Sequence, residues 1–99
     1  MAYQIEYSPD AEDHLWRLTA RQRGIVLDTA DRQLTEEPTV ETRNRKPMRP
    51  NPLAPWELRI GNLRVYYDVE EEPEKAVLIR AVGIKRRNSV YIGKEVMRL

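Results

Sequence analysis

The spacing of hydrophobic and polar positions divides the chain into elements of two kinds. Residues 2–7 carry an apolar side chain at every second position, which predicts a short strand. Apolar residues then recur at helical spacing over about 9–18 and again from residue 20 to about 36. Beyond residue 55 the alternation returns, so the chain is predicted to start and finish with strands around a helical part.

The two helical segments each have their own start signal. Ser8 is a capping residue followed by Pro9 at the first helical position, while Thr19 and Gln22 match a capping box. Pro38 is expected to end the second helix. Because no residue is left over for a loop between them, the segments predict an antiparallel helical hairpin that packs on a sheet.

The second half of the chain supplies the rest of that sheet. Its strand-like segments are rich in Val, Ile, Leu and Tyr and cover residues 56–60, 63–69 and 75–84. Gly61-Asn62 is a two-residue hairpin turn, and the acidic run 70–74 forms the second turn. The order β-α-α-β-β-β predicts an α+β fold: one domain over residues 1–99, with a small, mainly antiparallel, twisted sheet and the N-terminal helical hairpin on one face.

The hairpin turn at Gly61-Asn62 also fixes the register of the strands beside it. Its apolar pairs are Ile60 with Leu63, Leu58 with Val65 and Trp56 with Tyr67, and these pairs should face the helices. On the other face Arg59 then lies opposite Arg64, and Glu57 opposite Tyr66. Like charges in such a pair are destabilising, although Glu57, diagonal to Arg64, can relieve part of the repulsion. The pattern predicts either an anion held between the two guanidinium groups or arginines that turn apart into solvent. Residues 75–84 are apolar at both parities, which leaves open the face that this strand turns to the helices.

Charge is distributed unevenly, although the net charge is only +1. Residues 1–42 carry four Arg and Lys against nine Asp and Glu, whereas residues 43–99 carry thirteen against seven. Such asymmetry suggests that the second half meets an anion, or that the two halves pair with each other. The proline-rich segment 38–55 adds cations at 43, 45, 46 and 49. It is predicted to be an ordered or semi-ordered loop, and neither a helix nor a central strand.

The amino-acid composition excludes several kinds of site. No cysteine is present, which excludes disulfides and thiol nucleophiles and fits a cytoplasmic protein. We expect no signal peptide, no membrane span and no metal or small-molecule cofactor. The only histidine, His14, lies in the acidic half and is expected at a boundary position, not as a base.

A basic cluster, Lys85-Arg86-Arg87, ends the last predicted strand and is followed by Tyr91. Together with Arg59, Arg64 and Glu57, these side chains could bind a phosphodiester and stabilise its pentavalent transition state. RNA carries its own nucleophile, the 2′-hydroxyl, so an enzyme of this kind needs only positioning, charge stabilisation and proton transfer. On the residues alone, nucleic-acid binding without cleavage stays equally open.

Two stretches carry a family resemblance. W-E-L-R-I-G-N-L-R-V-Y-Y-D-V (residues 56–69) and V-L-I-R-A-V-G-I-K-R-R-N-S-V-Y (residues 77–91) resemble the core of RelE/ParE-superfamily toxins of bacterial type II toxin–antitoxin systems. The order of elements also fits, so the resemblance covers nearly the whole chain. For the RelE branch it implies a ribosome-dependent endoribonuclease that cuts mRNA without a metal, and a cognate antitoxin as partner.

The resemblance also assigns roles to individual residues. The catalytic positions would be Arg59, Arg64, Lys85, Tyr91 and Glu57; the RNA-binding positions would be Lys46, Arg49, Arg86, Arg87 and Arg45. Arg64 falls on the arginine that stabilises the transition state, and Tyr91 on a tyrosine used for proton transfer or base stacking. Glu57 stands where RelE itself has a lysine, so the general base is Glu57, Lys85 or Tyr91. The alternatives are a ParE-like inhibitor of DNA gyrase and a family member that binds its antitoxin or RNA without cleavage.

Overall fold

The computed structural model describes residues 2–98. Within them lie two helices and seven strands: β1 (Gln4–Tyr7), α1 (Pro9–Trp16), α2 (Ala20–Leu34), β2 (Arg45–Pro47), β3 (Trp56–Ile60), β4 (Leu63–Glu70), β5 (Ala76–Arg86), β6 (Ser89–Ile92) and β7 (Glu95–Met97). Neither helix in this range is long and apolar enough to cross a membrane. The predicted α+β fold, with a helical hairpin at the N-terminus, is confirmed.

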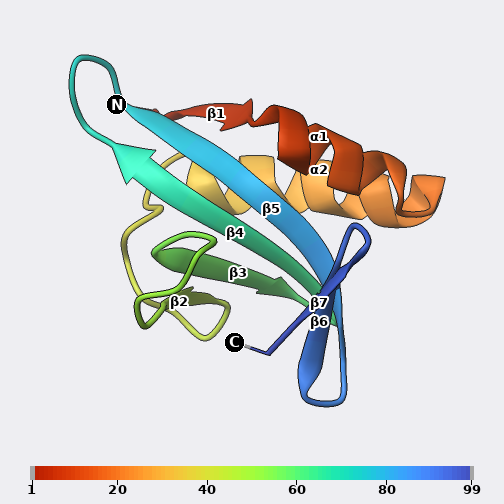
Figure 1. Ribbon diagram of the computed structural model, residues 1–99. Helices are drawn as coiled ribbons and strands as arrows, with labels where there is room; N and C mark the ends of the chain where they lie inside the picture. The colour runs from red at the N-terminus through yellow and green to blue at the C-terminus, as the bar shows by residue number, and fades with distance from the viewer. Residues whose placement is uncertain (1, 99) are drawn as a thin grey trace.

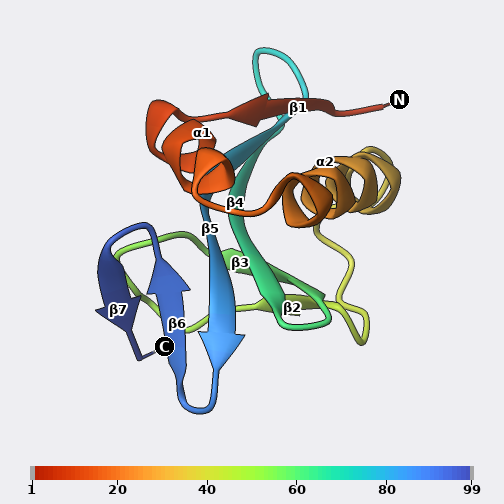
Figure 2. The same cartoon turned by 90° about the vertical axis from the view of Figure 1, so that its right-hand side faces the viewer.

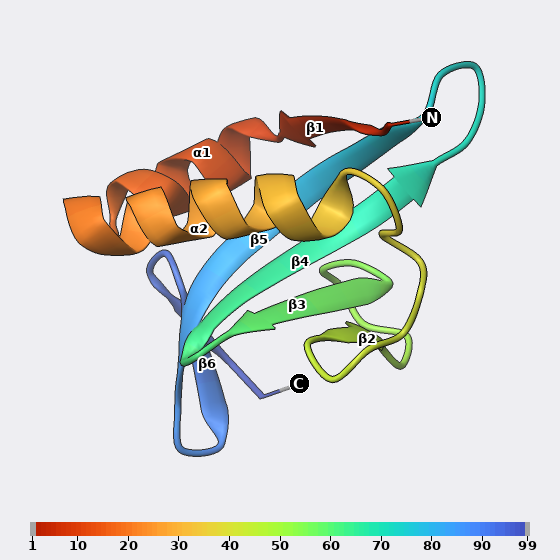
Figure 3. The ribbon, with the colours of Figure 1, turned by 180° about the vertical axis from the view of Figure 1, so that it is seen from behind.

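The helices form one layer over a strongly twisted sheet (Figure 1). Strands run in the order β2-β3-β4-β5-β6-β7, and β1 pairs in parallel with the first half of β5. α1 packs on β5, and α2 packs on β3 and β4. Seen from behind, α2 runs along the length of the sheet while β2 and the C-terminal segment lie on the far side from it (Figure 3). The buried core between the layers is formed by one face of each helix and alternate residues of the central strands.

Both helices begin where the sequence predicts. The Ser8 hydroxyl accepts a hydrogen bond from the Ala11 N–H at 3.1 Å, and Thr19 and Gln22 form the complete capping box. Both helices end about two residues earlier than predicted, at Trp16 and Leu34. At the end of α1 the backbone tightens, because Leu18 N–H bonds to the Leu15 carbonyl three residues back, which is the spacing of a closing turn.

The register of the β3–β4 hairpin is as predicted. Arg59 lies opposite Arg64 and Glu57 opposite Tyr66. Gly61 occupies the turn with a φ of +59°, a left-handed conformation that glycine adopts without strain. The two-residue turn was therefore sufficient to place two arginines side by side on the face away from the helices.

A β-bulge explains why β5 is apolar at both parities. Tyr66 pairs with Ala81 but Tyr67 pairs with Ile79, so Arg80 is an extra residue on β5. Ile79 faces the helices before the bulge and Val82 faces them after it. The other parity is buried in a second, smaller core around Tyr66, on the opposite face of the sheet.

Two parts of the sheet were not predicted. The short edge strand β2 lies inside the proline-rich segment, where Pro47 is tolerated because it pairs only with β3. The larger omission is the C-terminal hairpin β6–β7, which turns away from the rest of the sheet (Figure 2). Its apolar side chains Val90, Ile92 and Met97 pack on the second core. This hairpin thus helps to bury Tyr66.

The sheet divides along β5, and α1 covers the point of division. β1 pairs with the first half of β5 and β6 with its last three residues, which leaves the backbone at Arg80–Gly83 without a strand on that edge. Side chains of the α1 segment complete part of the pairing: the Ser8 hydroxyl donates to the Arg80 carbonyl at 3.2 Å, and Val82 N–H donates to His14 Nδ1 at 3.2 Å. His14 is thus a half-buried boundary residue that contacts the backbone.

Candidate functional site

A basic pocket of about 980 Å³ lies on the face of the sheet away from the helices. Its walls come from the proline-rich loop, strands β2 to β5 and the C-terminal hairpin. Among the described residues it is lined by six cations and one carboxylate: Lys46, Arg49, Arg59, Arg64, Lys85 and Arg98, with Glu57 among them. We call it the basic pocket. An excess of cations in a concave site favours an anionic ligand.

Glu57 joins the two facing arginines on the floor of the pocket. Arg59 Nε donates to Glu57 Oε1 at 2.7 Å, and Arg64 Nε lies 4.0 Å from Glu57 Oε2. Glu57 is 7% exposed and Arg64 is 8% exposed, whereas the Arg59 side chain is about half exposed. A single buried carboxylate therefore offsets the repulsion between the guanidinium groups and leaves positive charge in excess.

Arg64 is held in place by the hairpin turn itself. Its Nη1 donates to the Gly61 carbonyl at 2.7 Å and to the Leu63 carbonyl at 2.9 Å. Because one nitrogen carries both bonds, the other guanidinium nitrogens are left to Glu57 and to a ligand. The sequence predicts a cation here, but only the structure gives it a fixed orientation.

Lys85 reaches the same pocket from β5. Strand alternation after the bulge puts Lys85 on the same face as Gly83, which lies opposite Arg64. Its backbone N–H donates to the Asn62 carbonyl at 2.7 Å, and its exposed side chain forms no ion pair with any described residue. The backbone of Lys85 is thus held in place, and its ammonium group is available to a ligand.

The proline-rich loop supplies the outer wall. Lys46 lies opposite Glu57 in the β2–β3 ladder, and its ammonium group also lies 3.5 Å from Glu41. Arg49 is exposed at the rim. The Asn51 side chain orders the loop by accepting from Leu53 N–H at 2.8 Å and Ala54 N–H at 3.1 Å, and by donating to the Ala54 carbonyl at 2.9 Å. Lys46 and Arg49 therefore belong to the predicted site.

Arg45 does not belong to this site, in contrast to the expectation from the sequence. It lies opposite Leu58, on the helix-facing side of β2. Its guanidinium donates to the Gln33 carbonyl at 2.7 Å and to the Val40 carbonyl at 3.0 Å. Arg45 thus fastens the loop to the end of α2, a structural role that alternation alone does not reveal.

Tyr91 and Arg86 lie outside the basic pocket, which corrects their predicted placement. In the β5–β6 hairpin Lys85 lies opposite Val90, and Ile84 lies opposite Tyr91. Val90 lines the pocket, so Tyr91 and Ile84 face the other side. Arg86 shares that side, with its guanidinium 5.2 Å from the centre of the Tyr91 ring. Arg87 occupies the turn at a φ of +58° and does not line the pocket.

Sequence reasoning missed three residues of this region. Asn88 and Arg98 line the pocket, and Tyr66 lies beneath it with a fully buried hydroxyl group. The apolar alternation of Val90, Ile92 and Met97 around Gly93 was a signal for the C-terminal hairpin, and hence for Arg98. Residues 2–98 contain no group of three His, Asp or Glu side chains placed to hold a metal ion.

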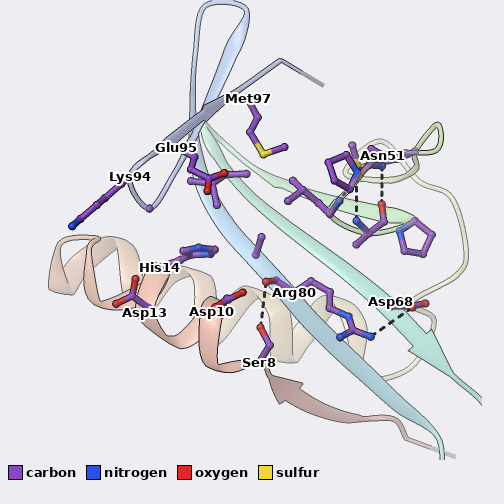
Figure 4. Close-up of a pocket in the computed structure, with 18 of the residues that line it drawn as sticks. Ser8, Asp10, Asp13, His14, Asn51, Asp68, Arg80, Lys94, Glu95 and Met97 are labelled. Atoms are coloured by element: carbon purple, nitrogen blue, oxygen red, sulfur yellow. Dashed lines mark hydrogen bonds and ion pairs between the residues drawn. The ribbon is translucent and has the colours of Figure 1, made fainter.

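A second pocket, of about 990 Å³, shares the loop residues 48–52 with the first. Figure 4 shows the side chains that line it. Its side chains come from the length of α1, from the proline-rich loop, from β4 and β5, and from the C-terminal hairpin. The pocket contains both acidic and basic side chains, and some of them form ion pairs. Arg17 lies 3.1 Å from Asp13, and Arg80 lies 4.0 Å from Asp68. With no excess of one charge, this pocket is a weaker candidate for an anionic ligand than the basic pocket.

His14 in the second pocket should make stability depend on pH. Burial lowers the pKa of His14 below its ordinary value, against the opposing influence of Asp10 and Asp13. The unfolded chain therefore takes up the proton first, so the free energy of unfolding should fall as pH drops below about 6.5. Thermal unfolding between pH 7.5 and 5.5 would measure this effect.

The matched variant is His14→Gln, because an amide oxygen can accept from Val82 N–H but does not titrate. The wild type should lose more stability over this pH range than the variant. Equal losses in the two proteins would show that carboxylates alone account for the pH dependence.

Comparisons with known proteins give a single type of match. No protein-family model and no curated protein matches the chain. Its structure is similar to a chain in the crystal structure of the toxin–antitoxin complex RelBE2 from Mycobacterium tuberculosis, with a TM-score of 0.73 and 26% sequence identity. The match covers 86% of this chain and 100% of that chain.

Proposed function

We propose that this RelE-type toxin is an endoribonuclease that cuts messenger RNA on the ribosome. The observation that carries the proposal is the basic pocket, in which six cations surround one buried carboxylate. A phosphodiester gains a second negative charge in its transition state, so a site of this charge binds the transition state more strongly than the ground state. The similarity to a chain of a toxin–antitoxin complex also supports the proposal that this protein is a toxin of this type.

The proposed reaction needs no nucleophile from the protein. The 2′-hydroxyl of the RNA attacks the adjacent phosphorus, the bond to the 5′-oxygen breaks, and a 2′,3′-cyclic phosphate and a 5′-hydroxyl result. Arg59 and Arg64 would hold the two non-bridging oxygens, since the planar guanidinium matches this geometry. Positioning and charge stabilisation would thus account for most of the rate enhancement.

Glu57 is the favoured general base. It is the carboxylate that lines the pocket and lies within 2.7 to 4.0 Å of both arginines. Its oxygen would accept the proton of the 2′-hydroxyl, while Lys85 would lie toward the departing 5′-oxygen and stabilise or protonate it. Tyr91 is not proposed for either step, because it faces the other side of the β5–β6 hairpin.

A cognate antitoxin is the proposed protein partner. The similar chain belongs to a toxin–antitoxin complex, which supports a partner of this type. An antitoxin that covered the basic pocket would block access of RNA, so acidic side chains in the covering segment would complement it. The proposed substrate also implies a cytoplasmic location, where ribosomes and mRNA are found.

Lys85→Ala is the sharpest test of the proposed function. The Lys85 side chain is exposed and forms no ion pair with residues 2–98, so its removal should leave the fold intact. With ribosomes bound to a defined mRNA, cleavage followed by primer extension should slow by about 10²-fold. Lys75→Ala is the matched control, because Lys75 is exposed at the opposite end of β5 and should leave the rate unchanged.

A supercoiling assay with DNA gyrase and the same proteins distinguishes a ribonuclease from an inhibitor of gyrase. Wild-type protein that leaves mRNA intact but blocks supercoiling would overturn the ribonuclease proposal in favour of a gyrase inhibitor. Binding of ribosomes without cleavage by the wild type would identify a family member without catalytic activity.

A further inference from the structure

Tyr66 has a buried hydroxyl group without a partner. The side chain has no solvent exposure and its ring is packed in the second core, against residues of the proline-rich loop, β5 and the C-terminal hairpin. Its hydroxyl is the buried side-chain polar atom among residues 2–98 that makes no hydrogen bond of normal geometry. Buried donors are nearly always paired, so this one calls for a functional explanation.

The residue opposite Tyr66 on the neighbouring strand is the proposed general base. Tyr66 lies directly opposite Glu57 on β3, and residues so paired have Cβ atoms about 5 Å apart on the same face. Burial is the main reason why the pKa of Tyr66 is raised far above its ordinary value, and the Glu57 carboxylate raises it further. The two groups are therefore close enough to interact, although their orientation in this state does not make a regular hydrogen bond.

Glu57 has the two arginines as its partners in this structure. Its Oε1 accepts from Arg59 Nε at 2.7 Å, and its Oε2 lies 4.0 Å from Arg64 Nε. A phosphate that binds the two guanidinium groups competes for these donors, because each arginine has a limited set of N–H groups. Glu57 would then lose its partner unless another donor replaced Arg59.

We infer that Tyr66 is a positioning residue that donates its hydroxyl hydrogen to the Glu57 carboxylate when a phosphate occupies Arg59 and Arg64. The inference rests on the proposed function, because it assigns a role in the same pocket. Tyr66 would hold one carboxylate oxygen and leave the other facing the 2′-hydroxyl. This contact would give the Tyr66 hydroxyl the hydrogen-bond partner that it lacks in this structure.

Tyr66→Phe tests the role and should preserve the fold, because phenylalanine fills the same space and removes an unsatisfied donor. Single-turnover cleavage at saturating mRNA-bound ribosomes should slow about tenfold, with the half-saturating concentration unchanged within twofold. Its thermal unfolding temperature should not fall.

Tyr67→Phe is the matched control. Tyr67 is the adjacent residue on β4 and equally buried, but its hydroxyl donates to the Pro38 carbonyl at 2.6 Å on the helix-facing side. This variant should have a lower unfolding temperature and a normal cleavage rate. Normal cleavage by Tyr66→Phe, or equal slowing by both variants, would overturn the proposed role.

A second measurement does not depend on cleavage. In protein labelled with ¹³C at tyrosine Cζ, saturation with inorganic phosphate should shift the Tyr66 resonance in the wild type and leave it in place in Glu57→Leu. If the wild type cuts no RNA but this shift occurs, the ribonuclease proposal fails and the Tyr66–Glu57 contact stands. An unmoved Tyr66 resonance in the wild type, at any phosphate concentration, overturns the contact whatever the protein cleaves.

Discussion

Arg64→Lys should lower the rate of mRNA cleavage by about 100-fold in a protein that remains folded. The variant keeps the positive charge beside Glu57 but loses the planar group that holds two phosphate oxygens at once. A lysine can still donate to the Gly61 or Leu63 carbonyl, which Arg64 now binds at 2.7 and 2.9 Å. Because those bonds compete for its single ammonium group, the transition state would lose most of its contact. Single-turnover cleavage on programmed ribosomes measures the loss.

Arg80→Lys is the matched control for this change. Arg80 lies on the neighbouring strand β5, is exposed, and pairs with Asp68 at 4.0 Å in the second pocket. Its replacement should leave both cleavage and growth arrest unchanged. If Arg64→Lys cleaves at the wild-type rate, then Arg64 is present for the hairpin alone and the proposed transition-state contact is wrong.

The part of the site that could be predicted depends on local geometry. Gly61 and Asn62 define a two-residue turn, and the turn alone places Arg59 opposite Arg64. Glu57 follows by alternation on the same strand. These predictions succeed because register in a tight hairpin is fixed by its turn and not by distant packing.

The parts that failed depend on contacts far apart in the sequence. The family resemblance places Arg45 among the RNA-binding residues, but its bonds to the Gln33 and Val40 carbonyls form only when the loop meets α2. Proximity in the sequence places Tyr91 beside Lys85. The face on which Tyr91 lies is instead set by the turn at Arg87 and by the pairing of β6 with β5, and β6 was not predicted. The bulge at Arg80 likewise depends on how β4 and β5 pack on two cores.

Gly83→Ala should destabilise the protein by about 3 kcal/mol, because β6 crosses this residue without room for a side chain. A Cβ atom at Gly83 would lie 2.7 Å from the Tyr91 carbonyl oxygen and 2.7 Å from Ile92 Cγ1. The first of these is backbone and cannot rotate away, so the C-terminal hairpin would have to shift. Since this hairpin covers Tyr66 and lines the basic pocket, cleavage should fall together with stability. Urea unfolding measures the change.

Gly24→Ala provides the opposite result in the same assay. Gly24 lies inside α2, and an added Cβ there meets no atom within 4 Å. Alanine is the better helix former, so this variant should gain about 0.5–1 kcal/mol. Hydrogen exchange can then show whether Gly83→Ala releases the hairpin alone, through faster exchange at residues 89–97 than in the rest of the sheet. If Gly83→Ala unfolds and exchanges hydrogen as the wild type does, the hairpin does not pack on β5 as described. The wall of the basic pocket would then have to be reassigned.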